Sequence, residues 1–227
     1  MKQRYNTFKK IHKGLRAMLY DTAISLQLND FTNTDGTVEV LEKLDQTLHI
    51  FYEHASHEDK FILPVIERFN AALATEFDRE HEKDEFMTRR INSMVSAYHS
   101  AGNVEGRIEG GEAISKAFNE FVAFNLFHMN KEEEKINPVL WANYTDEEIR
   151  GIERALVATI SKEEMMITSK WMLLGINDAE IVAWLQTIKY NAPCFIFQSM
   201  MELAEKVLST NRWNKIQGDL TEGLLLA

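Results

Sequence analysis

Residues 54–64 read His-Ala-Ser-His-Glu-Asp-Lys-Phe-Ile-Leu-Pro, and residues 128–138 read His-Met-Asn-Lys-Glu-Glu-Glu-Lys-Ile-Asn-Pro. Each segment has a His, a Glu four residues later, an acid at the next position and a Pro ten residues after the His. Residues four apart lie on one face of an α-helix, roughly 6 Å apart along its axis. Each segment therefore presents an imidazole and a carboxylate to the same point. Two such helices side by side can hold a pair of metal ions.

Composition favours helices and argues against several classes of partner. The chain of 227 residues has only 10 Gly and 3 Pro, and its net charge of −10 argues against binding nucleic acid or anionic membranes. Cys194 is the only cysteine, so one chain cannot form a disulfide, a thiolate zinc site or an iron–sulfur cluster. The first ten residues lack the apolar run of a signal peptide, and no stretch of about 18 apolar residues suggests a membrane span. We therefore expect a soluble cytoplasmic protein.

The first part of the chain carries four stripes of apolar residues with the helical period. They predict helices over about 12–26, 37–69, 74–98 and 114–139. Gly102, Gly106, Gly110 and Gly111 are interpreted as the connection before the fourth helix. No stripe alternates as a half-buried strand would. The prediction is an all-α protein whose residues 1–143 form an up-down four-helix bundle.

Polar side chains interrupt these inward stripes at one common level. They are His12, His54 with Glu58, His81, and His128 with Glu132. Burying such groups is costly unless each finds a partner, and a pair of metal ions would compensate all of them. The alternative is that some stripes are wrongly phased and that these groups face water.

The remainder of the chain, residues 144–227, is predicted to be a helical extension, packed on the bundle or used for contact with a partner. Thr145, Ser161 and Asn177 each precede a Glu by three residues, which is a signal for the start of a helix. Pro193 follows at the same step of 16 residues. These signals predict about four short helices over 146–158, 162–174, 178–190 and 193–209. Residues 221–227 are expected to form a loosely held tail.

The types of ligand atom limit which metal the site can bind. Imidazole and carboxylate without thiolate favour iron, then manganese, with zinc as a further substitute. Glu58 and Glu132 each have two oxygens and can bridge two ions, which leaves an open position for a small molecule such as dioxygen or nitric oxide. The ferritin-like alternative requires Glu three residues before a ligand His, and none of the seven His has one.

The order of these motifs, with Pro after each His–Glu pair, resembles the hemerythrin-like family over residues 1–141. The resemblance implies a four-helix bundle with a non-haem, oxo- or hydroxo-bridged pair of iron ions. Its predicted ligands are His12 and His81 as terminal ligands, His54 and His128 as further ligands, and Glu58 and Glu132 as bridges. The extension is also similar to helices that follow the bundle in some members of the family.

Several positions stay open at this stage. Glu85 stands where oxygen-carrying hemerythrins have a second His, and it is interpreted as an extra ligand, an acceptor behind a ligand, or an exposed residue. His57 would replace His54 if the helix were rotated. Asp59 is expected on a solvated face, unless it hydrogen-bonds a ligand imidazole. His49 and His99 are expected on the surface or in packing.

Three functions fit this sequence. The first is a protein that binds dioxygen or nitric oxide for sensing, storage or the response to oxidative or nitrosative stress. The second is a di-iron enzyme or iron donor, acting as a ferroxidase, in peroxide reduction or in iron–sulfur repair through the chemistry of the metal itself. The third is an iron-responsive regulatory protein that contacts a protein partner, or a second copy of itself, through its C-terminal helices.

Overall fold

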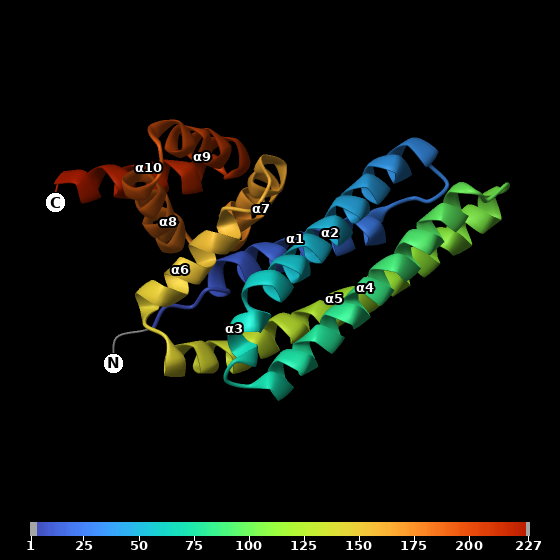
Figure 1. The fold of residues 1–227 in the computed structure, drawn as a ribbon. Helices are drawn as coiled ribbons and strands as arrows, with labels where there is room; N and C mark the ends of the chain where they lie inside the picture. Colours follow the sequence, from blue (N-terminus) through green and yellow to red (C-terminus); the bar gives the residue numbers. More distant parts are fainter. Residues whose placement is uncertain (1–3, 226–227) are drawn as a thin grey trace. The chain divides into compact units, whose positions relative to one another are not determined.

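A computed structural model describes the backbone of residues 4–225 and the side chains up to residue 221. Every regular element in this part of the chain is a helix, which confirms the all-α prediction (Figure 1). The helices are α1 Lys9–Leu28, α2 Thr34–Phe61, α3 Leu63–Glu67, α4 Ala71–His99, α5 Val104–Asn143, α6 Asp146–Val157, α7 Lys162–Gly175, α8 Asp178–Asn191, α9 Cys194–Val207 and α10 Thr210–Leu225. The chain is a helical bundle followed by additional helices, as predicted.

Asparagine side chains begin the long bundle helices. Asn33, Asn70 and Asn103 precede α2, α4 and α5, and each side chain accepts a hydrogen bond from a backbone N–H in the first turn. These bonds satisfy donors that the helix itself leaves without partners. The caps also explain why all three helices begin earlier than the apolar stripes predicted.

The second predicted helix is interrupted. An unbroken helix to residue 69 was wrong, because α2 ends at Phe61 and a short helix, α3, begins at Leu63. Pro64 lies in the first turn of α3, where its missing N–H leaves no bond unmade. The proline that closes the first motif therefore starts a new helix.

The interpretation of the glycines as a connection was also wrong, since only Gly102 precedes α5 and the other three lie inside it. A glycine within a helix costs about 1 kcal/mol relative to alanine. Gly111 is required nonetheless, because a Cβ there would come within 2.2 Å of the Phe31 ring. Phe31 in turn packs edge-on against Tyr98, with ring centroids 6.0 Å apart.

Contacts within the chain define two compact units. The first holds the described residues up to Lys9 together with Met18–Ile160, and the second holds Lys10–Ala17 together with the described residues from Ser161 onward. The predicted domain boundary between residues 143 and 144 stays a prediction. One end of the first unit has an apolar cluster that includes Ile66, Phe77 and Ile136.

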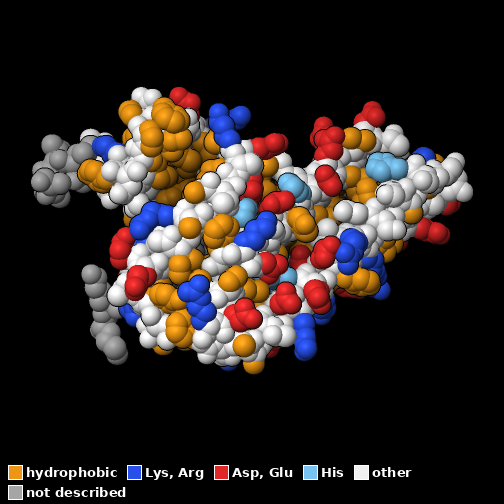
Figure 2. Space-filling view, in the orientation of Figure 1, with side chains coloured by type: hydrophobic (Ala, Val, Ile, Leu, Met, Phe, Trp, Pro, Cys, Tyr) orange, Lys and Arg blue, Asp and Glu red, His pale blue; other side chains and the backbone are white. Residues whose placement is uncertain are grey.

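The second unit has a core of its own, which includes Leu173, Leu185 and Ile216. The extension has one helix more than predicted, because α10 follows α9 and carries Ile216 into this core. Hydrophobic side chains also gather on the visible surface of α9 (Figure 2). The prediction of a loose tail over residues 221–227 was wrong for residues 221–225, because these residues belong to α10. Residues 226–227 lie outside the described part of the chain.

None of the helices in the described part of the chain is both long and apolar enough to cross a membrane.

Candidate metal centre

Three bundle helices bring imidazoles and carboxylates to one buried point. Glu58 of α2, His81 of α4, and His128 and Glu132 of α5 each offer a ligand atom, and these atoms all lie within 4.8 Å of one another. His128 Nε2 lies 3.1 Å from Glu132 Oε1, and His81 Nε2 lies 3.5 Å from Glu58 Oε2. At most 6% of each of these four residues is exposed, so the cluster is shielded from water.

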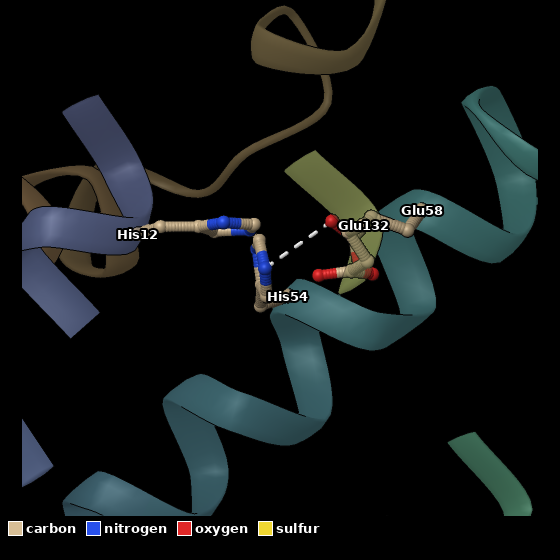
Figure 3. Close-up of side chains that lie close together, drawn as sticks. All are labelled: His12, His54, Glu58 and Glu132. Carbon is tan, nitrogen blue, oxygen red and sulfur yellow. Dashed lines mark ion pairs between the residues drawn. The ribbon is translucent and has the colours of Figure 1, made fainter. Parts of the chain in front are cut away.

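His54 joins the cluster through the helical spacing that its motif predicts. Its Nε2 lies 3.2 Å from Oε1 of Glu58, one turn further along α2 (Figure 3). Glu132 of α5 lies close to this pair (Figure 3). His12 lies in the stretch of α1 that clusters with the C-terminal helices, so its role as a ligand stays a prediction.

Carboxylates of neighbouring helices fix two of the imidazoles. His81 Nδ1 donates to Asp59 of α2 at 2.6 Å, and His128 Nδ1 donates to Glu80 of α4 at 2.7 Å. A carboxylate can only accept, so both Nε2 atoms are left to face the cluster. These two Nε2 atoms lie 3.2 Å apart, where two lone pairs would repel each other unless a proton or a metal ion lies nearby.

The electrostatic environment of the cluster favours positive charge. Burial lowers the pKa of His81, but hydrogen bonds to Asp59, Glu132 and Glu58 outweigh it and raise the pKa to about 12. Burial also lowers the pKa of His128, and the negative charge of Glu132 contributes most to raising it to about 10. A metal cation can replace these protons, because imidazole must be deprotonated to bind a metal. Nitrogen and oxygen donors of this kind fit iron, manganese or zinc.

A family model, hemerythrin HHE cation binding domain, matches residues 3–140. The chain belongs to this family. Its hemerythrin domain thus includes every ligand predicted from the sequence, from His12 to Glu132. Searches of curated proteins and of solved structures found no match.

The other histidines of the hemerythrin domain fall outside this centre. His57 is buried but is not grouped with Glu58 and Glu132 as a ligand, which favours the helix phase that uses His54. His49 and His99 are exposed. Glu85 is not grouped with the ligands either, and it forms an ion pair with Arg89 at 2.5 Å on the surface.

The sequence did not reveal three residues that support the centre of the hemerythrin domain. Glu80 holds His128, and the hydrogen bond from this imidazole lowers the pKa of the Glu80 carboxyl. Asp84 accepts a hydrogen bond from Asn125 Nδ2 at 2.6 Å, and burial raises the pKa of Asp84 to about 6. Asp84 and Asn125 could have been noticed as polar residues on inward stripes. Glu80 belongs to no repeat, and only the structure shows its role.

Removing the Glu80 carboxylate should weaken metal binding. We expect Glu80→Ala to lower metal affinity about 10- to 100-fold, because the imidazole of His128 loses the acceptor that orients it. Glu80→Gln keeps an acceptor and should recover part of the loss. Competition titration with a chromophoric chelator measures both variants.

The control for this experiment is Lys131, which forms an ion pair with Glu80. Lys131→Met removes the ion pair and leaves the hydrogen bond to His128. Affinity as low in Lys131→Met as in Glu80→Ala would show that orientation of the imidazole is not the cause.

Proposed function

We propose that the hemerythrin domain holds two iron ions and binds dioxygen or nitric oxide, for sensing, storage or the response to oxidative or nitrosative stress. One observation carries the proposal: the buried cluster of imidazoles and carboxylates borders a pocket of about 200 Å³ that His81 itself lines. A small molecule can reach the centre by this pocket without unfolding of the bundle. Membership of the cation-binding family supports the presence of a metal.

Some of these side chains would bind the metal ions, and others would orient the side chains that bind them. His12, His54, Glu58, His81, His128 and Glu132 would bind the ions, with the two glutamates as bridges. Asp59 and Glu80 would keep the imidazoles of His81 and His128 in the orientation that metal binding requires. These side chains supply fewer donor atoms than two iron ions accept, so a bound iron pair offers an open position where a diatomic molecule can bind.

Aromatic rings would limit the access of water to this position. Phe124 stacks on the His128 ring with centroids 5.8 Å apart, and Phe77 contacts the same ring edge-on at 5.7 Å. An apolar wall excludes solvent and favours uncharged ligands such as dioxygen and nitric oxide over hydrated anions.

Gas binding is tested with anaerobic protein loaded with ferrous iron. We expect about two irons per chain, the number that the six predicted ligands can hold, and new visible absorption when dioxygen or nitric oxide is added. Protein loaded with zinc is the matched control, because zinc has no redox chemistry and should give no such bands. Iron-loaded protein whose spectrum changed with neither gas would refute gas binding while leaving the metal site in place.

A further inference from the structure

The pocket beside His81 is lined largely by acidic side chains. It lies between α2 and α4 and is lined by His81 and by five carboxylates, Asp59, Asp78, Glu82, Asp84 and Glu85. None of the described residues that line it is Lys or Arg. Acidic side chains are visible along α4 on this face, with histidine among them (Figure 2). A cleft lined by one sign of charge concentrates ions of the opposite sign.

The exposure of the pocket carboxylates decreases from the surface inward. Asp78 and Glu82 are exposed, whereas Asp84 is only 5% exposed. Asp84 and His81 lie one turn apart on α4 and line the same pocket. The pocket therefore extends from exposed acids at its mouth to a buried acid beside a predicted ligand.

Asp84 has binding capacity that the fold does not use. Its Oδ1 accepts the hydrogen bond from Asn125, but no described residue donates to its Oδ2. This second oxygen remains accessible in the pocket, where it can bind a cation. Asp84 matches no position of the two His–Glu motifs, so the predicted ligand set does not explain it.

We propose that this pocket is the route by which divalent cations enter the centre, and that Asp84 binds the cation in transit to His81. The inference rests on the proposed function, since it assumes that the hemerythrin domain holds metal. It adds a pathway and a selecting residue to that function. Cations are drawn in by the acids at the mouth, and anions are repelled.

The test follows the uptake of cobalt(II) by metal-free protein, using the visible absorption that cobalt gains on binding and a stopped-flow instrument. We expect Asp84→Asn, which preserves the acceptor for Asn125, to slow uptake about tenfold at low ionic strength. The Asp78→Asn/Glu82→Gln double variant should also slow uptake, and salt should slow the variants less than the parent because it screens fewer charges. The amount bound at saturation should not change.

Glu134→Gln is the matched control, because Glu134 is exposed and does not line the pocket. Uptake at the parent rate in both Asp84→Asn and the double variant would overturn the proposal, as would equal slowing in Glu134→Gln. Less cobalt at saturation in Asp84→Asn would mean that Asp84 is a permanent ligand and not a transit residue. If Asp84→Asn does not fold, the double variant of exposed residues decides the question. A parent protein that took up no cobalt would refute the metal site itself.

Discussion

Glu132→Ala is expected to abolish most metal binding. Glu132 is fully buried within the cluster of possible ligand atoms, and its two oxygens are predicted to bridge both ions. Its Oε1 lies 3.1 Å from His128 Nε2 and 3.8 Å from His81 Nε2. We expect bound iron to fall from about two per chain to less than about 0.5, because each ion loses a charged ligand that alanine cannot replace.

Metal analysis of protein purified without oxygen measures this loss. Glu134→Ala is the matched control, since it removes an exposed carboxylate only two residues away on the same helix. The control should retain the metal content of the parent. Full metal content in Glu132→Ala would contradict the assignment of Glu132 as a ligand. A loss of metal in both variants would show that the lost negative charge, and not a lost ligand, lowers metal binding.

Removal of the metal is expected to lower thermal stability by about 10 °C. A ligand present at about 1,000 times its Kd stabilises the folded state by about 4 kcal/mol, and 1 kcal/mol shifts the Tm of a chain of this length by about 2–4 °C. Without metal, the carboxylates of Glu58 and Glu132 stay buried next to the imidazoles of His81 and His128, which then carry protons in place of the metal.

Thermal unfolding followed by circular dichroism, before and after treatment with a chelator, measures the difference. Addition of ferrous iron or zinc to the treated protein should restore the Tm, whereas magnesium, which prefers oxygen ligands, should not. A Tm that did not change on chelation would show that the cluster is stable as a network of protonated histidines.

The bundle and the proximity of each His to its Glu could be predicted because both patterns repeat. His54 with Glu58 and His128 with Glu132 share one spacing, and the period of the apolar stripes fixes which faces meet. Contacts between distant parts of the chain could not be predicted. Gly111 lies within a helix because of Phe31, a residue 80 positions earlier, and no local signal reports such a contact.

The sequence around the start of α10 lacks the pattern that marks the first three helices of the extension. Thr145, Ser161 and Asn177 are each followed by Glu at the third position, a pattern that predicts the start of a helix. At the start of α10 the equivalent position after Ser209 is Arg212. Arg212 donates instead to Asp178 Oδ1 at 2.8 Å, which ties α10 to α8. Ser209 still caps the helix, because its Oγ accepts a hydrogen bond from the Arg212 backbone N–H at 3.5 Å. Only the Glu of the pattern is replaced, by a residue that makes a tertiary contact.

The hydrogen bonds to the imidazoles of His81 and His128 also fix the register of the bundle helices. Asp59 of α2 holds His81 of α4, and Glu80 of α4 holds His128 of α5. A shift of α4 by one residue moves it 1.5 Å along its axis and breaks its alignment with both neighbours. The centre can therefore move to another level of the bundle only if residues on adjacent helices change together. Single substitutions can destroy it, but its relocation in evolution or in design requires coordinated pairs.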